Sequence, residues 1–346
     1  FFLEIGSEEL PSGYVQPALD YMHKELSSFF SKNRIEAETP KTMGTPRRLI
    51  VSVKGVMALQ EDSVDEFLGP GISVAYDDQG QPTKAATGFA RGKGIDVSDL
   101  TRKQTPKGEV ICARVENKGR VTSSLLNEYL PQLISEIPFP KKMRWQNKSR
   151  PFARPLHWVT ALFEGQALQF EFDGIANDAI SRGHRFLNPE KFQVKDLESY
   201  LTECEKHFLV VDPDIRKKTI LAQVQQLAEK AGGHIKEDEE LLNLVNFLVE
   251  FPVAIKGNFD SGFLELPQEL LVITMKYHQK YFPIWDKAEK LLPCFITVSN
   301  MPASEGNEIQ KGNERVLRAR LEDARFFYDE DRKKKLEDFV EPLKGV

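Results

Sequence analysis

Hydrophobic residues recur along the chain with two different periods. Near the N-terminus, Val15, Leu19, Met22 and Leu26 are three or four residues apart, which is typical of one apolar helix face. Residues 109–115 instead alternate between apolar and polar, which is typical of a half-buried strand. The same patterns predict the other elements, with strands at 1–5, 49–56, 156–163, 167–173, 251–259 and 292–300, and helices at 11–30, 121–137, 195–205, 212–231, 238–248, 267–278 and about 307–335.

The helix at 212–231 has the clearest end signals. Asp212 is a suitable N-cap and Pro213 suits the first turn, where its missing N–H removes no helical hydrogen bond. Gly232 and Gly233 follow the last apolar position and favour termination there, since glycine adopts the left-handed conformation at low cost. We expect this helix to begin at Pro213.

The segment 137–155, IPFPKKMRWQNKSRPFARP, interrupts these patterns. It contains four prolines and six Lys or Arg residues with little periodicity, so it is predicted to be a long ordered loop or a linker. We therefore expect an α+β protein of several domains, with mixed sheets, packed helices and a helical C-terminal segment. The predicted divisions are an N-terminal α+β domain at 1–137, a basic proline-rich linker at 138–155, a second α+β domain at 156–306, and a helical segment at 307–346 that leads into a further C-terminal part.

Composition supports a multidomain globular chain. With 346 residues, 40% of them hydrophobic and 29% charged, the chain is too long for one ordinary core. Its three cysteines, Cys112, Cys204 and Cys294, form no CxxC pair, which favours a reducing cytoplasm over a disulfide framework. No apolar run reaches the roughly 18 residues of a membrane span. The chain begins without Met and ends directly after a helical pattern, so we expect it to be part of a longer protein.

The sequence lacks the common catalytic and cofactor motifs. There is no GxxxxGK[ST] phosphate loop, no GxGxxG after a strand, no HExxH and no zinc-ligand pair. The six histidines are scattered, and none has a second histidine four residues away on a helix. We therefore predict no catalytic residue, no metal site and no cofactor bound by this chain.

Cations and aromatic residues do gather in a few loops and one helix. Arginine forks bind phosphate through two parallel hydrogen bonds, and aromatic faces stack on unpaired bases or ribose. Such groups can hold a folded RNA by its shape. The candidate RNA-binding residues are Arg47, Arg48, Lys141, Lys142, Arg144, Arg150, Arg154, Arg182, His184, Arg185, Lys276, His278, Lys280, Arg315 and Arg318.

Each group also has a structural alternative. Arg47 and Arg48 could pair with the acidic residues near the N-terminus. The loop 141–158 could join two domains through buried arginine pairs. In the last helix, Arg318 lies four residues from both Glu314 and Glu322, so that helix could neutralise itself.

Several segments, in order, resemble one known family. They are FFLEIGSEELPSGYV at 1–15, GTPRRL at 44–49, GPGISVAYDDQGQPTKAATGFARGKGI at 69–95, KMRWQ at 142–146, FARPLHWVTALF at 152–163, ISRGHRF at 180–186, MKYHQKYFPI at 275–284, and GNERVLRARLEDARFFYDEDRKKKLED at 312–338. Each segment is weakly specific, whereas the ordered set is highly specific. Together they resemble the N-terminal half of the β subunit of the bacterial two-subunit glycyl-tRNA synthetase.

The resemblance implies a subunit of an α2β2 ligase that joins glycine to tRNA(Gly). ATP and Mg2+ would be used at the α subunit, while the β subunit would supply much of the tRNA binding. The expected partners are the α subunit and tRNA(Gly), with no membrane; a β–β contact is left open. A helical domain related to His-Asp hydrolases and an anticodon-binding domain would follow Val346. The second domain, 156–306, would resemble the editing module of the phenylalanyl enzyme.

Two other functions compete with tRNA binding. The chain could be a scaffold that holds the α subunit without touching RNA, or an editing-type hydrolase with a pocket near His184 and His278. The segment 275–286, MKYHQKYFPIWD, does not separate them. There we expect the apolar residues Met275, Tyr277, Phe282 and Ile284 to seat a helix-to-strand junction. Lys276, His278 and Lys280 are then expected to face outwards, toward tRNA or the partner subunit.

Overall fold

The computed structural model describes residues 1–106, 108–145, 150–302, 307–333 and 335–340. The chain forms two compact units. The first consists of Phe1–Leu26, Thr39–Lys54 and Leu130–Val346, and the second of Ser27–Glu38 and Gly55–Tyr129. Both units contain helices and strands, with several sheets in the first and one described sheet in the second, so the predicted α+β class with mixed sheets is confirmed.

The first unit is built on a seven-stranded mixed sheet. Its main order is β2-β3-β1-β7-β10-β9, and β8 also pairs with β7. Most neighbours are antiparallel, while β10 runs parallel to β7. The strands are β1 (Phe2–Ser7), β2 (Lys41–Thr45), β3 (Arg48–Ser52), β7 (Leu156–Phe163), β8 (Gln166–Ala167), β9 (Glu171–Phe172) and β10 (Ile175–Asp178).

This sheet pairs segments from both sides of the proline-rich stretch. β1 lies antiparallel to β7, with Gly6 opposite Trp158. The predicted domain boundary at 138–155 is therefore corrected, because 130–346 belongs to the same unit as the N-terminal strand. The loop itself folds back, since the backbone N–H groups of Met143 and Phe152 donate to each other's carbonyl oxygens at 2.8 and 3.2 Å. A proline-rich segment without hydrophobic periodicity can thus form a loop that folds back within one unit.

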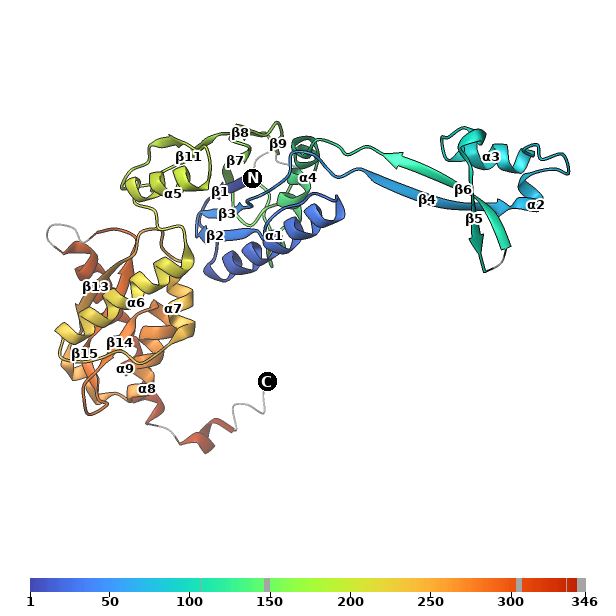
Figure 1. Ribbon diagram of the computed structural model, residues 1–346. Helices are drawn as coiled ribbons and strands as arrows, with labels where there is room; N and C mark the ends of the chain where they lie inside the picture. The colour runs from blue at the N-terminus through green and yellow to red at the C-terminus, as the bar shows by residue number, and fades with distance from the viewer. Residues whose placement is uncertain (107, 146–149, 303–306, 334, 341–346) are drawn as a thin grey trace. The chain divides into compact units, whose positions relative to one another are not determined.

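Helices cover both faces of the seven-stranded sheet (Figure 1). Val15 and Leu19 of α1 (Ser12–Lys32) pack against β2, where a Cβ atom at Gly44 would lie 3.1 Å from each side chain. On the other face, Tyr200 and Cys204 of α5 (Leu197–Lys206) join a buried cluster with the sheet. The helix α4 (Thr122–Glu136) begins in the second unit, which ends at Tyr129, and leads into the proline-rich loop. The strand β11 (Ile180–Arg182) pairs with β12 (Lys191–Gln193) in a separate hairpin.

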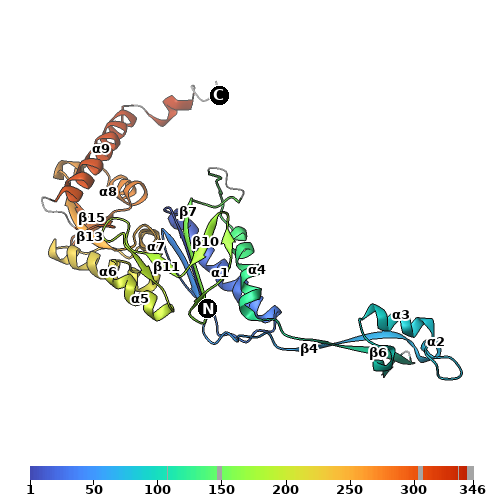
Figure 2. The same cartoon turned by 90° about the horizontal axis from the view of Figure 1, so that it is seen from above.

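The rest of the first unit surrounds a three-stranded antiparallel sheet in the order β13-β15-β14. Along β15, Cys294 and Ile296 join the core that contains α6 and α7, whereas Phe295 joins the core that contains α8 and α9. Figure 2 shows α6 and α9 on opposite sides of these strands. The elements are α6 (Pro213–Lys230), α7 (Glu239–Asn246), β13 (Val253–Asn258), η2 (Ser261–Glu265), α8 (Gln268–Ile273), the π-helix η3 (Thr274–Gln279), β14 (Phe282–Trp285), β15 (Leu291–Ser299), α9 (Glu308–Asp331) and η4 (Leu336–Phe339).

The predicted start of α6 is confirmed. The Asp212 side chain accepts hydrogen bonds from the backbone N–H groups of Asp214 and Ile215, and Pro213 opens the helix. The C-terminal helix is also present, but Leu317 and Leu321 pack into the core beside β15. The prediction of a separate helical segment at 307–346 is therefore corrected for α9, because this helix forms one layer of the first unit.

The second unit has its own small sheet, ordered β4-β6-β5 and antiparallel throughout. Ala75, Ala86 and Ile111 are buried at its centre. Its elements are β4 (Ser63–Gly71), α2 (Ile72–Ala75), α3 (Lys84–Gly92), η1 (Val97–Asp99), β5 (Thr101–Thr105) and β6 (Gly108–Asn117).

Candidate nucleic-acid interface

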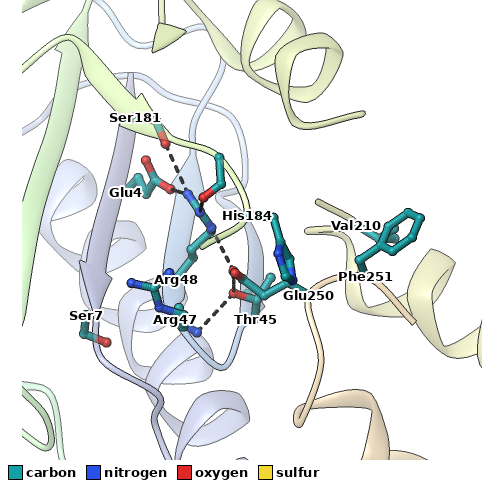
Figure 3. A network of polar contacts seen from close by, with 12 residues as sticks. Glu4, Ser7, Thr45, Arg47, Arg48, Ser181, His184, Val210, Glu250 and Phe251 are labelled. Carbon is teal, nitrogen blue, oxygen red and sulfur yellow. Dashed lines mark hydrogen bonds and ion pairs between the residues drawn. The ribbon is translucent and has the colours of Figure 1, made fainter. Parts of the chain in front are cut away.

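A buried polar network lies at the end of β3, with Arg48 at its centre (Figure 3). The Arg48 Nε donates to Glu250 Oε1 at 2.9 Å and Nη1 donates to Glu4 Oε1 at 2.8 Å. The remaining donors reach the Ser181 hydroxyl at 3.3 Å and the Gly183 carbonyl at 3.1 Å. One guanidinium therefore connects β1, β3, β11 and the segment before β13.

The electrostatics of this network keep its groups ionised. Burial alone would raise the pKa of Glu250, but Arg48, the Thr45 hydroxyl and Arg47 outweigh it and hold that pKa below its ordinary value. Burial alone would lower the pKa of Arg48, but Glu250 and Glu4 outweigh it and raise that pKa. Buried charges are tolerated only when paired and hydrogen-bonded, as they are here.

For Arg48, the structural alternative is therefore confirmed, because it pairs with the N-terminal Glu4. Arg48 is fully buried and is removed from the candidate RNA contacts. His184 is also fully buried, and its Nδ1 accepts hydrogen bonds from the backbone N–H groups of Phe186 and Leu187. Neither side chain lies at the surface.

The neighbouring Trp158 is fixed by close packing on β1. It stands opposite Gly6 in the β1–β7 pairing, and a Cβ atom at position 6 would lie 2.0 Å from Cε2 of the indole. Glycine is required there because the ring occupies the space of a side chain. The Cζ atoms of Arg48, Arg182 and Arg47 lie 5.0, 5.4 and 5.9 Å from the centre of the indole ring.

Acidic residues near the N-terminus neutralise another part of this region. Arg185 Nη1 lies 3.1 Å from Glu8 Oε2 and 3.6 Å from Glu9 Oε1. His157 Nε2 is 2.8 Å from Glu8 Oε1. Burial opposes ionisation of Glu8, but the hydrogen bond from His157 and the charge of Arg185 lower its pKa. The structure therefore brings Arg47, Arg182 and Arg185 into one region, and gives Arg185 a carboxylate partner.

The basic proline-rich loop is more open. Lys141, Lys142, Arg144 and Arg150 are exposed, and Arg154 is half-buried. Lys142 donates to the Ser135 carbonyl at 2.9 Å, and Arg150 donates to the Pro131 carbonyl at 3.2 Å. Residues 146–149 lie outside the described residues. Among those described, none of the five loop cations forms an ion pair, so the predicted buried arginine pairs are not found.

The segment 275–286 only partly follows its expected arrangement. Met275, Phe282 and Ile284 are buried as expected, whereas 53% of Tyr277 is exposed. Lys276 does not project freely, because its Nζ lies 2.8 Å from Asp238 and 3.3 Å from Glu240. His278 is exposed, and Lys280 donates to the Tyr277 carbonyl at 2.5 Å. In α9, Arg315 and Arg318 are exposed.

Sequence reasoning offered the N-terminal acidic residues as partners of Arg48, but it missed Glu250 and the position of Trp158 in this region. Glu4 interrupts the otherwise apolar FFLEI, and a charge inside a strand that is buried on both faces was an available signal. Glu250 had no comparable signal, because the fold brings it to Arg48 across 202 positions. Trp158 was visible as an aromatic residue near the basic loop, but its place against Gly6 depends on strand register.

Comparisons with known proteins place the whole chain in one family. Residues 1–346 match the family model described as Glycyl-tRNA synthetase beta subunit. The chain is 50% identical over 345 residues to the glycine–tRNA ligase beta subunit of Citrifermentans bemidjiense, and 48% identical to that of Geobacter metallireducens. In both cases the match covers 100% of this chain and 50% of the relative, so the chain spans about half the length of these curated relatives.

These matches identify an aminoacyl-tRNA synthetase subunit. The chain belongs to the glycyl-tRNA synthetase β-subunit family. None of the helices in the described part of the chain is both long and apolar enough to cross a membrane. Among the described residues, no group of three or more His, Cys, Asp or Glu side chains is arranged to hold a metal ion.

Proposed function

We propose that this chain is a tRNA-binding, non-adenylating part of glycine–tRNA ligase. It acts with an α subunit in the ATP-dependent attachment of glycine to tRNA(Gly), with ATP and Mg2+ used at that subunit. Family membership supports the ligase role. The observation that carries tRNA binding is the loop Lys141–Arg154, whose described cations are mostly exposed and form no ion pairs among described residues.

Unpaired, exposed cations favour a polyanionic partner for a simple reason. A lysine or arginine already paired with a carboxylate must lose that partner before it can bind phosphate. Arg144 has no such partner among the described residues, and the paired backbone at Met143 and Phe152 holds the loop ends. Because the loop is already ordered there, less conformational entropy is lost on binding, and more of each contact remains as affinity.

The test is the salt dependence of tRNA binding by the full-length chain. Replacing Lys142 and Arg144 by Ala should weaken binding of different tRNAs to a similar extent. It should also flatten the plot of log affinity against log salt by about one unit for each lost phosphate contact. The matched control is K287A/K290A, which removes two exposed lysines from the turn before β15.

The proposal predicts an unchanged melting temperature for the loop variant. A lower melting temperature with an unchanged salt slope would assign the loop a structural role instead.

A scaffold without RNA contact is the second candidate function, and one observation favours it. Phe326 and Phe327 of α9 are 60% and 64% exposed and pack edge to face, as expected of a protein-binding surface.

A further inference from the structure

Two arginines beside Trp158 form no ion pair with an acidic residue in the described part of the chain. The guanidinium carbons of Arg47 and Arg182 lie 5.9 and 5.4 Å from the centre of the indole. Within the described parts of the chain, neither side chain forms an ion pair, whereas their neighbour Arg48 pairs with Glu4 and Glu250. Positive charge is thus concentrated around one indole ring and is only partly neutralised.

Two hydrogen-bond donors of this cluster are buried and unused. Arg47 Nε and Trp158 Nε1 have no hydrogen-bond partner among the residues that the structure describes, although only 8% of Arg47 and 6% of Trp158 are exposed. A buried donor without an acceptor costs about 1–3 kcal/mol, and more when it is charged. Such groups are normally satisfied by a partner. These two donors therefore have no acceptor in the described part of the chain, although the buried Oε2 atoms of Glu4 and Glu250 are also without a hydrogen-bond partner.

The nearby carboxylates do not fill this role. Glu250 and Glu8 attract Arg47 through space and counteract the lowering of its pKa by burial, yet neither forms a hydrogen bond with it. Glu250 instead accepts from Arg48 and the Thr45 hydroxyl, and Glu8 pairs with His157 and Arg185. Glu250 Oε1 and both oxygens of Glu8 are thus engaged by other side chains, and the unpartnered Oε2 atoms of Glu250 and Glu4 accept no hydrogen bond from Arg47.

We propose that Arg47, Arg182 and the indole N–H of Trp158 form a binding site for a phosphate group of an RNA backbone; this inference rests on the proposed tRNA binding. The three side chains come from the β2–β3 turn, β7 and β11. A phosphate presents several acceptor oxygens and suits donors that approach from separate strands, and guanidinium groups bind it in forked geometry. Trp158 is already fixed against Gly6. Little ordering cost then remains on binding.

The test uses the full-length chain assembled with its partner subunit, with tRNA as the ligand. R182A removes a half-buried cation that has no described acidic partner, so no carboxylate is left unpaired. It should weaken tRNA binding about tenfold and reduce the salt slope by about one unit. The melting temperature should stay the same or rise, because one of several like charges is lost. W158F keeps an aromatic ring but removes the N–H donor together with one of the two fused rings, so its melting temperature is measured alongside its affinity. It should weaken binding severalfold at an unchanged salt slope.

K195A is the matched control. Lys195 is an exposed cation just after β12, and its loss changes the net charge by the same amount as R182A. It should leave affinity and salt slope unchanged. The proposal is overturned if R182A and W158F bind tRNA as the native protein does, or if R182A loses only its affinity for the partner subunit, which would indicate a protein carboxylate as the occupant. A native assembly that binds no tRNA would instead overturn the proposed function itself.

Discussion

Arg48 shows how a single residue can join distant parts of the chain. Its four hydrogen bonds go to two carboxylates, a hydroxyl and a backbone carbonyl, and none of its surface reaches solvent. Arg216 has a similar role, because it donates to the carbonyls of Asn246, Val210 and Gly44. Burial lowers the pKa of Arg216 to about 10, which still leaves it charged at neutral pH. These arginines are structural, despite sharing a residue type with the candidate RNA contacts.

The Arg48–Glu250 ion pair leads us to expect that the stability of the fold depends on pH. E250Q keeps the shape of the side chain but removes its charge, so at pH 7 we expect the free energy of unfolding to fall by about 3 kcal/mol. The folded-state pKa of Glu250 lies below its ordinary value of 4.5. Its contribution is therefore complete above about pH 4.5 and is lost as pH falls through the folded pKa. The difference between native protein and E250Q should shrink at acid pH.

Urea unfolding of the native protein and E250Q from pH 7 down to pH 3 measures this difference. E9Q is the control, since Glu9 is mostly exposed and its nearest contact to Arg185 is 3.6 Å, and it should change stability little. Parallel stability curves for the native protein and E250Q would contradict the assignment of a depressed pKa to this carboxyl group.

At the scale of elements, hydrophobic periodicity predicted the long helices and the central strands. α6 begins at Pro213 as expected, and β15 (Leu291–Ser299) lies within one residue of its predicted position. The short strands β10 to β12 were missed, because runs of three or four residues carry too little periodicity. The candidate cations could be selected by residue type. Sequence alone did not show that Arg48 forms ion pairs whereas the Arg47 side chain forms none with the described residues, since that depends on which strands meet.

The π-helix η3 shows another limit of periodicity. The predicted helix at 267–278 is present, but its second half winds more loosely and ends at Lys280, which has φ of 61°. This backbone conformation is strained for a residue other than glycine. K280G should therefore stabilise the protein by up to about 1 kcal/mol, reduced by the loss of the hydrogen bond to the Tyr277 carbonyl.

Q279G is the matched control one position earlier. Gln279 has helical geometry, so glycine there should destabilise by about 1 kcal/mol. Thermal melting of the two variants should give shifts of opposite sign. Destabilisation of equal size at both positions would show that Lys280 is not strained in the folded protein.

At the scale of the whole molecule, the sheets of the two units differ in the size of the buried clusters around them. The first contains buried clusters that combine aromatic, aliphatic and sulfur-containing side chains on both of its main sheets. Around the small sheet of the second unit, the described cluster is formed by Ala75, Ala86 and Ile111, with partly buried residues around it. Larger buried side chains of this unit, such as Phe30 and Leu126, lie in the ends of α1 and α4 instead. Burial of less apolar surface gives less stabilisation. The second unit is therefore expected to open more readily than the first.

Hydrogen exchange of the native full-length chain measures this difference directly. Amides of β5 and β6, which pair between Thr101 and Cys112, should exchange faster than those of β1 and β7, because local opening requires less apolar surface to be exposed. I111A should accelerate exchange in β4, β5 and β6 while leaving β1 and β7 unchanged, since Ile111 is fully buried in the small cluster. I296A is the matched control, because Ile296 is fully buried between β15 and α6 and should affect β13 to β15 instead. Equal protection of β1 and β6 in the native protein, or a uniform acceleration by I111A, would mean that the two units open together as one cooperative structure.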